Sequence, residues 1–160
     1  MPIQYIKGDA TQPQGAGLKI IAHVCNDMGA WGKGFVVALS KRWKKPEADY
    51  RAWYLSKTDF ALGDVQFVEV APDIVVANMI GQHKIYKDKN GVQPIRYGAV
   101  SEALEKVAAY ALENKASFHA PRFGAGLAGG SWSVIEQIIE HELVERGIAV
   151  TIYDFEAPLP

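Results

Sequence analysis

Two glycine-rich stretches contain the residues whose types and spacing could do chemistry. Residues 26–34 read Asn-Asp-Met-Gly-Ala-Trp-Gly-Lys-Gly, and residues 124–130 read Gly-Ala-Gly-Leu-Ala-Gly-Gly. Each lies between a short apolar run and an amphipathic run, which predicts a strand, a glycine turn and a helix start in succession. Such a junction points backbone N–H groups at an anion, and glycine lets a ligand approach the backbone closely. Either stretch alone is also explained by a tight connection that binds nothing, but two of them could hold a diphosphate between them.

Known nucleotide and metal motifs are not found in this sequence. Neither glycine stretch is a Walker loop, because no Gly-Lys-Ser/Thr follows, and neither fits the dinucleotide fingerprint. The four histidines, His23, His83, His119 and His141, show no metal-ligand spacing. The single cysteine, Cys25, excludes an internal disulfide and a cysteine-rich zinc site. We therefore expect neither a metal nor a cofactor.

Alternating strands and helices must position these stretches. Strands are expected at 4–7, 19–25, 65–70, 74–80, 116–123 and 148–155, and helices at 35–43, 46–55, 96–113 and 131–146. The polar segment 84–93 predicts an exposed and mobile loop. The alternation predicts an α/β fold with a mostly parallel sheet covered on both faces. Ligands of such sheets bind at the carboxyl ends of the strands. The unusual residue groups all lie at such ends, at 8–9, 26–34, 81–83, 124–130 and 153–155, and predict one nucleotide-sized site.

Length and charge narrow the class of protein. The 160 residues suit one domain, 1–160, and the composition is 49% hydrophobic and 22% charged. The formal net charge of −1 argues against a protein whose main task is to grip a nucleic-acid backbone. A small basic cluster is either a solvated helix end or a short nucleic-acid footprint; it comprises Lys41, Arg42, Lys44, Lys45 and Arg51. No signal peptide and no apolar run of membrane-spanning length is present, so we expect a cytoplasmic protein without membrane contact.

Four motifs together resemble the macrodomain family over nearly the full length of the chain. They are Gly8-Asp9-Ala10-Thr11, then Ala22 to Asn26 leading into Trp31-Gly32-Lys33-Gly34, then Pro121 to Leu127, and finally Val150 to Asp154. The resemblance points to the branch that contains the terminal ADP-ribose protein glycohydrolase, the yeast ADP-ribose 1″-phosphate phosphatase and bacterial relatives. It implies a three-layer α/β/α sandwich with a central mixed, mostly parallel sheet. It also implies that the ligand is ADP-ribose.

The resemblance assigns ligand-binding roles to residues at the strand ends. Asp9 is implied to accept a hydrogen bond from the adenine amino group, Asn26 to touch the distal ribose, and Phe155 to pack on adenine together with Tyr153. The two diphosphate loops and their neighbours complete the ligand-binding set with Ala10, Trp31, Gly32, Lys33, Gly34, Gly124, Ala125, Gly126 and Leu127. Without the resemblance, Asp9 is a turn aspartate, Asn26 a strand-end cap, Lys33 a solvated charge, and the two aromatics are core residues.

The sequence departs from the family where catalysis is concerned. The human glycohydrolase of this branch uses a lysine just after the fourth strand and an aspartate after the Gly-Leu of the second loop, where this chain has Ala128. A lysyl adduct is therefore not expected, and a water held near the distal ribose would attack instead. We take Asn26, Gln82 and His83 as catalytic candidates, with Asp27 beside them. His83 is the most versatile because imidazole can act as both acid and base, and its alternative is a solvent-exposed loop histidine. His23 and Cys25 are interpreted as core residues.

Three functions follow from these residues. The first is hydrolysis of an ADP-ribosyl ester, which would remove mono-ADP-ribose from acidic side chains, or of a related ADP-ribose 1″-phosphate. The second is a non-catalytic reader of ADP-ribose, and the third is an eraser of ADP-ribose on nucleic acid. The first two share every binding residue. The partner is ADP-ribose or an ADP-ribosylated protein, while the net charge disfavours nucleic acid.

Overall fold

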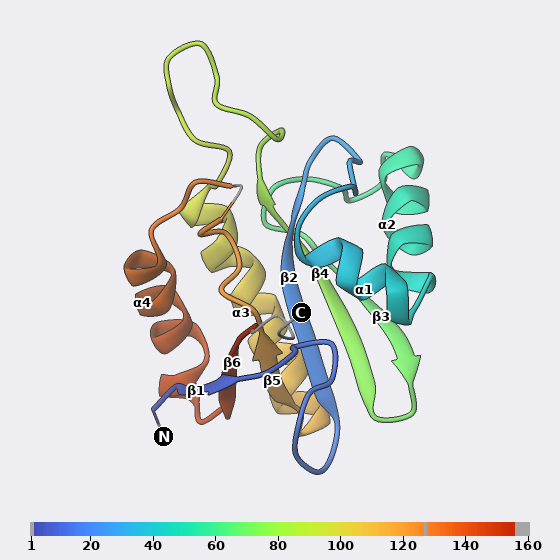
Figure 1. Cartoon of the computed structure of the whole chain (residues 1–160), viewed down its shortest axis with the longest axis vertical. Coiled ribbons are helices and arrows are strands. Elements are labelled where there is room, and N and C mark those ends of the chain that lie inside the picture. The colour runs from blue at the N-terminus through green and yellow to red at the C-terminus, as the bar shows by residue number, and fades with distance from the viewer. Residues whose placement is uncertain (1, 127, 156–160) are drawn as a thin grey trace, which may run out of the picture.

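The computed structural model describes residues 2–126 and 128–155 (Figure 1). The strands are β1 (Gln4–Lys7), β2 (Lys19–Asn26), β3 (Val65–Ala71), β4 (Ile74–Gln82), β5 (Ser117–Ala120) and β6 (Val150–Asp154). The helices are α1 (Phe35–Arg42), α2 (Lys45–Ser56), α3 (Tyr97–Asn114) and α4 (Trp132–Glu142), and a 3₁₀ turn, η1, covers Val144–Arg146. The predicted order of elements is confirmed. In the described residues, no helix is both long and apolar enough to cross a membrane.

Three predicted boundaries in the last third of the chain are wrong. The strand expected at 116–123 ends at Ala120, because Pro121 has no N–H to donate and the Phe123 N–H turns back to the Pro121 carbonyl at 2.7 Å. The helix expected at 131–146 ends at Glu142 and tightens into η1. The final strand covers Val150–Asp154 rather than 148–155.

The six strands form one sheet in the order β1-β6-β5-β2-β4-β3. Every neighbouring pair is parallel except β3 and β4, which form an antiparallel hairpin. Helices α1 and α2 cover one face of the sheet, and α3 and α4 cover the other (Figure 1). The three-layer α/β/α sandwich with a mixed, mostly parallel sheet is therefore confirmed. Because β1, β6, β5, β2 and β4 all run in one direction, their carboxyl ends share one edge of the sheet, here called the C-terminal edge.

Two hydrophobic cores fix this edge in place. Strand β2 is buried on both faces: Ile20 belongs to the core under α3 and α4, and Ile21 to the core under α1 and α2. Such a strand reads as continuously apolar in the sequence. On the α1–α2 side, the buried Tyr50 donates its hydroxyl hydrogen towards Asn26, 2.6 Å from the main-chain oxygen and 2.9 Å from Oδ1. This contact ties α2 to the end of β2.

The buried polar groups of the middle strands are paired. His23 Nε2 lies 2.6 Å from Asn78 Oδ1, and the Asn78 amide donates to Gln66 Oε1 at 3.0 Å. Burial lowers the pKa of His23 to about 4, so this imidazole is neutral near pH 7. Burial raises the pKa of the Cys25 thiol well above its ordinary value, so this thiol stays protonated. The interpretation of His23 and Cys25 as core residues is confirmed.

Candidate functional site

A cavity of about 760 Å³ opens at the β1–β6 end of the C-terminal edge. Its walls come from the residues after β1, from the end of β6 and the residue behind it, from Gly34 and one face of α1, and from Pro121 after β5. They include Asp9, Ala10, Thr11, Gly34, Phe35, Lys41, Arg42, Tyr153 and Phe155. The cavity therefore gathers residues that are far apart in the sequence. Three predicted ligand-binding residues that come from separate motifs, Asp9, Gly34 and Phe155, share its lining.

Asp9 is held by a turn and still faces the cavity. Its Oδ1 accepts hydrogen bonds from the Thr11 N–H at 2.8 Å and from the Thr11 hydroxyl at 2.7 Å. The Arg42 guanidinium lies 3.8 Å from Oδ2, and its Nε donates to Thr11 Oγ1 at 2.8 Å. Asp9 is thus a turn aspartate, as the sequence also allowed, but only its Oδ1 makes the hydrogen bonds that hold the turn. Oδ2 keeps lone pairs for a donor inside the cavity.

The two aromatic residues that β6 and its end bring to the cavity, Tyr153 and Phe155, behave differently. Tyr153 is buried, and its hydroxyl oxygen accepts the Gln14 N–H at 2.9 Å and lies 2.7 Å from His119 Nδ1. His119 Nε2 lies 2.7 Å from Ser117 Oγ, and burial lowers the pKa of His119 to about 4. Tyr153 is therefore a fixed core residue. Phe155 is 70% exposed, so its core interpretation is wrong and its ring is free to contact a planar ligand.

The first glycine loop is built around Asn26. Its Oδ1 accepts the N–H groups of Met28 and Ala30, both at 3.0 Å, and its Nδ2 donates to the Ala30 carbonyl at 2.8 Å. With the Tyr50 hydroxyl also near Oδ1, three donors converge on this oxygen, and Asn26 is buried. Asn26 thus shapes the loop, and the strand-end cap interpretation is confirmed.

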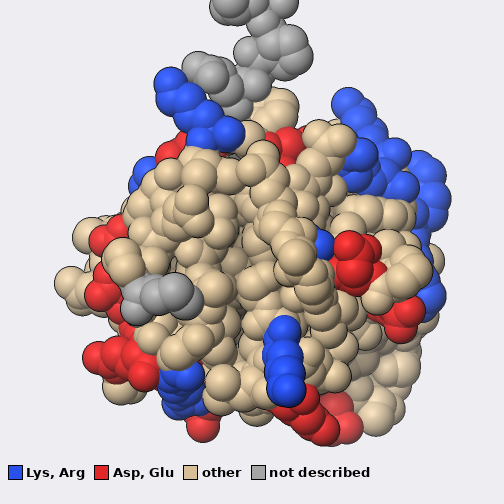
Figure 2. All heavy atoms as spheres, turned by 90° about the horizontal axis from the view of Figure 1, so that it is seen from below, with Lys and Arg blue, Asp and Glu red and all other residues tan. Residues whose placement is uncertain are grey.

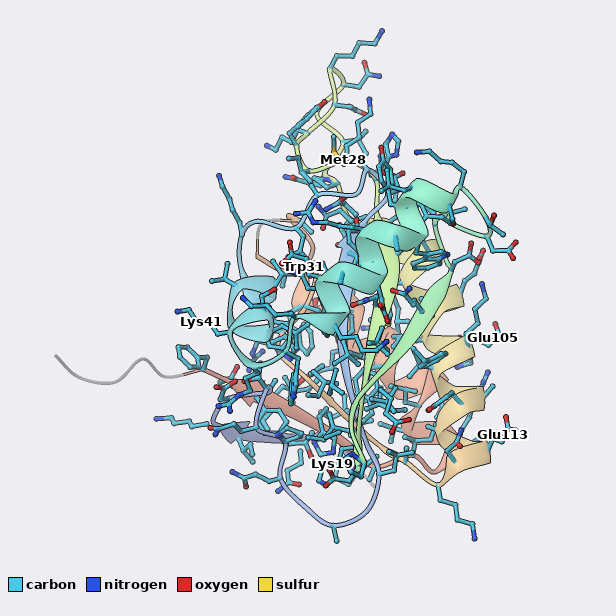
Figure 3. All side chains as sticks on the ribbon, turned by 90° about the vertical axis from the view of Figure 1, so that its right-hand side faces the viewer. Lys19, Met28, Trp31, Lys41, Glu105 and Glu113 are labelled. Atoms are coloured by element: carbon cyan, nitrogen blue, oxygen red, sulfur yellow. The ribbon has the colours of Figure 1, made fainter. Side chains whose placement is uncertain are left out.

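The residues that follow Asn26 in this loop divide into buried and exposed ones. Trp31 lies under the loop in the α1–α2 core, where its Nε1 donates to Ser40 Oγ at 2.8 Å (Figure 3). The structure places Trp31 as a support of the loop and not in the cavity wall. Gly32, Lys33 and Gly34 are exposed and lead directly into α1. The first turn of α1 contains no acidic residue, and Gly34 has no side chain to cap it, so its N–H groups suit an anion.

The second glycine loop is a compact turn whose conformation requires glycine at Gly124. Its φ is 76°, and an added Cβ would lie 2.8 Å from Ile95 and 2.9 Å from Ile135. Gly130 donates its N–H to the Gly124 carbonyl at 2.8 Å, and Gly129 donates to Gly126 at 3.0 Å. A Cβ on Gly126 would meet open space, so this residue faces outward.

Leu127 and Ala128 follow Gly126 in the sequence of this loop. Leu127, a predicted ligand-binding residue, lies outside the described residues. Ala128, which replaces the aspartate of the family pattern, is buried, and its carbonyl accepts the Ile95 N–H at 3.1 Å. Ala128 therefore anchors the loop to the segment before α3.

At the β4 end of the edge, Asp27 and His83 form a carboxylate–imidazole pair that the sequence does not reveal. Asp27 Oδ2 lies 2.6 Å from His83 Nδ1, and Oδ1 accepts the Lys84 N–H at 2.8 Å. Gln82 lies opposite Asn26 in the strand register, and its Nε2 donates to the Lys84 carbonyl at 2.9 Å. His83 is therefore not a free solvent histidine. An imidazole whose Nδ1 hydrogen faces a carboxylate keeps Nε2 as a proton acceptor.

The groups follow one another along the edge in the order of the strands. Asp9 follows β1, Phe155 follows β6, the second glycine loop follows β5 and the first glycine loop follows β2. Gln82 ends β4, and His83 comes directly after it. Four spacings of about 4.8 Å between adjacent strands give a site roughly 19 Å long. Within residues 2–126 and 128–155, no group of three or more histidine, cysteine, aspartate or glutamate side chains could hold a metal ion.

The basic cluster lies next to this edge. Figure 2 shows lysine and arginine side chains gathered on the side of α1 and α2. Two of the five cluster residues are neutralised within α2, because Lys45 pairs with Asp49 at 2.6 Å and Arg51 with Glu47 at 3.0 Å. The cluster is thus mainly a solvated helix end with internal ion pairs.

Two solved structures are similar to this chain in both sequence and fold. A solved structure of a protein of unknown function from Bacteroides thetaiotaomicron is 60% identical, covers 96% of this chain and 98% of that one, and gives a TM-score of 0.96. A macrodomain protein from Streptomyces coelicolor is 55% identical, with a TM-score of 0.83 and coverage of 95% and 98%. No family model matches the sequence.

Two curated proteins are also similar. The chromodomain-helicase-DNA-binding protein 1-like of Danio rerio is 34% identical over 94% of this chain, which spans 15% of that protein. An ADP-ribose 1″-phosphate phosphatase of Candida albicans is 28% identical over 86% of this chain and 92% of its own length. The fold, the glycine loops and the Streptomyces relative agree, and this chain therefore belongs to the macrodomain family.

Proposed function

We propose that residues 1–160 act as one macrodomain that binds ADP-ribose along the C-terminal edge and hydrolyses an ADP-ribosyl ester. The observation that carries this proposal is the order of groups along the edge. A cavity with Asp9 and Phe155 lies at one end, two glycine loops lie in the middle, and the Asp27–His83 pair lies at the other end. Adenine, diphosphate and distal ribose follow one another in the same order in ADP-ribose.

Each part of the ligand meets matching chemistry in this placement. The free lone pairs of Asp9 Oδ2 accept the adenine amino group, and the exposed Phe155 ring covers the base. Ala10 contributes to the cavity wall beside them. The diphosphate lies between the glycine loops, where Gly34 opens α1 and Gly126 faces open space. The second amide hydrogen of Asn26 donates a hydrogen bond to the distal ribose, which then lies near the end of β4.

In the proposed reaction, the Asp27–His83 pair activates water. Asp27 holds the Nδ1 hydrogen of His83, so Nε2 accepts a proton from a water molecule. The water oxygen forms a bond to the anomeric carbon of the distal ribose while the bond from that carbon to the ester oxygen breaks. The acceptor leaves as a carboxylate, ADP-ribose is released, and His83 returns its proton to solvent. Gln82 and Asn26 on adjacent strands position the ribose for this attack.

We propose a water route over a lysyl adduct because Ala128 replaces the aspartate of the lysyl route and no lysine directly follows β4. Lys84 is the second residue after β4, and its backbone is held in a left-handed conformation with φ of 59°. Both its N–H and its carbonyl are occupied, by Asp27 and Gln82 respectively. The Candida relative, whose name states that it acts on ADP-ribose 1″-phosphate, supports hydrolysis at the distal ribose. The natural partner in this proposal is a protein that carries ADP-ribose on a glutamate or aspartate.

Two measurements test the proposal. Calorimetry with ADP-ribose should give a micromolar Kd, corresponding to about −8 kcal/mol. Incubation with glutamate-linked, serine-linked and thymidine-linked ADP-ribosylated substrates should release ADP-ribose from the glutamate-linked one. Absence of heat at millimolar ADP-ribose would contradict binding. Binding without release from any substrate would instead identify a reader.

Variants of the carboxylate–imidazole pair separate its catalytic role from a structural one. His83→Gln and Asp27→Asn should lower kcat by about a hundredfold, the effect typical of a lost general base, and leave the Kd for ADP-ribose nearly unchanged. His141→Gln is the matched control, because this exposed histidine on α4 also pairs with a carboxylate, Glu145, at 3.0 Å. Equal kcat values in parent and His83→Gln would refute the assigned role.

A further inference from the structure

One loop at the β4 end of the site remains without a role. Residues 84–93 leave the body of the protein between β4 and α3 and stand out from it (Figure 1). At the base of the loop, the His83 N–H donates to the Pro94 carbonyl at 2.8 Å and the Arg96 N–H donates to the Gly81 carbonyl at 2.9 Å. At the tip, Asp88 Oδ1 accepts the N–H groups of Asn90 at 2.8 Å and Val92 at 3.0 Å. Hydrogen bonds thus hold the loop together both at its base and at its tip.

The base of this loop touches both glycine loops. Asp27, which follows β2, accepts the Lys84 N–H. On the other side, the Gln93 side chain packs directly on Gly129, where it occupies the space that a Cβ would need. Met28, next to Asp27, lies at the foot of the loop (Figure 3). The loop therefore begins where the distal ribose would end, at the opposite end of the edge from Asp9.

The side chains of the loop are unusual for a solvated connection. Three large apolar residues are exposed, Ile85 at 48%, Tyr86 at 58% and Val92 at 47%, and Met28 beside them is 37% exposed. Grouped exposed apolar residues mark interaction sites more often than scattered ones do. Charge is also one-sided: the loop contains Lys84, Lys87 and Lys89, and its single acidic residue, Asp88, uses its carboxylate to cap the tip.

We propose that the 84–93 loop binds the acceptor polypeptide, and that this acceptor is an acidic peptide segment with apolar residues near the modified glutamate. The inference rests on the proposed function, because it assigns the loop to the group attached to ADP-ribose. The lysines match acidic residues that flank the modification, and Ile85, Val92 and Met28 match aliphatic side chains. A single-stranded nucleic acid fits less well, since it needs a series of stacking rings and the loop offers one exposed ring, Tyr86.

The experiment compares free ADP-ribose with a glutamate-linked ADP-ribosyl peptide that has acidic and apolar flanks. Affinities are measured by competition in the His83→Gln background, so that turnover does not consume the peptide. The protein with the unchanged loop should bind the modified peptide at least tenfold more tightly than it binds ADP-ribose. Two loop variants, Ile85→Ser with Val92→Ser and Lys87→Glu with Lys89→Glu, should each remove most of that gain and leave the ADP-ribose Kd unchanged. The altered side chains are exposed, so folding should not change.

The controls and outcomes distinguish this inference from the proposed function. Leu55→Ser, at a 72% exposed position on α2, and Lys115→Glu, at the opposite edge of the sheet, should leave both affinities unchanged. No ADP-ribose binding by the parent would overturn the proposed function and the inference with it. Equal affinity for ADP-ribose and peptide, or a peptide gain that survives both loop variants, would overturn the inference alone. If the loop increases the affinity for a thymidine-linked ADP-ribosyl oligonucleotide but not for the peptide, the acceptor is a nucleic acid and the peptide proposal is overturned.

Discussion

Replacing Asp9 by asparagine should shift the preference of the cavity from adenine towards hypoxanthine. The two Thr11 hydrogens, at 2.8 and 2.7 Å, hold an oxygen on their side of the turn in either residue. The asparagine NH₂ group then takes the place of Oδ2, so a hydrogen-bond donor faces the cavity where an acceptor stood. Adenine presents an amino group there, and hypoxanthine presents a carbonyl. Asp9→Asn should therefore weaken ADP-ribose binding and strengthen binding of the hypoxanthine analogue.

The size of this effect follows from the surroundings of Asp9. A hydrogen bond to a charged group contributes about 1.5–3 kcal/mol. The Asp9 side chain is 29% exposed and Arg42 lies 3.8 Å away, so screening by water favours the lower end of that range. A loss of about 1.4 kcal/mol weakens binding by roughly tenfold.

Calorimetry with ADP-ribose and with its hypoxanthine analogue, at one salt concentration, measures the exchange. Asp59→Asn is the matched control: it removes the same charge at an exposed residue whose φ of 51° asparagine tolerates. Thermal melting of both variants checks the fold. If Asp9→Asn binds both nucleotides as the parent does, Asp9 is only a turn residue and the assigned position of adenine is wrong.

Three further outcomes are expected. Gly126→Glu should abolish ADP-ribose binding in calorimetry, because its carboxylate repels the diphosphate. Its Tm should be unchanged, because a Cβ at this position meets open space. The control Ala109→Glu, on the outer face of α3, should bind ADP-ribose normally. Borohydride trapping and intact-mass measurement should detect no ADP-ribosyl adduct, and Lys84→Ala should keep its turnover; an adduct lost in Lys84→Ala would show a lysyl route. Burial lowers the pKa of His23 and His119 to about 4, so the unfolded chain binds more protons between pH 6.5 and 4. The free energy of unfolding should fall with decreasing pH across this window by about 1.4 kcal/mol per pH unit for each histidine. Urea titrations should show a smaller slope in His119→Gln than in the parent, and an unchanged slope would contradict the assignment.

The fold was predictable where one physical signal dominates. Strands β2 and β4 are buried on both faces, so their interiors are apolar apart from His23 and Asn78, and the glycine stretches mark both junctions. The end of β5 was misplaced because the apolar run continues through Pro121, whose missing N–H stops the ladder. Hydrophobicity alone does not register that loss.

The site was predictable as a set of strand ends but not as a set of contacts. The order of strands brings Asp9, Phe155 and Gly34 to one cavity, and no local pattern encodes that order. Asp27 and His83 are 56 residues apart in the sequence and meet because β2 and β4 are adjacent. Since the ionisable pair depends on sheet topology, periodicity and motif spacing could not reveal it.

The parallel pairing of β1 and β6 has a consequence for protein engineering. Strand β1 begins opposite Thr151 and ends opposite Asp154, so the described chain starts at the edge of the sheet away from the site and its last described residue, Phe155, lines the cavity. A reporter joined behind β6 would start from the rim of the cavity. A reporter joined in front of β1 would start from the far edge. Immobilisation through the front end should therefore leave the cavity accessible, and an environment-sensitive dye placed just behind β6 should respond to ligand.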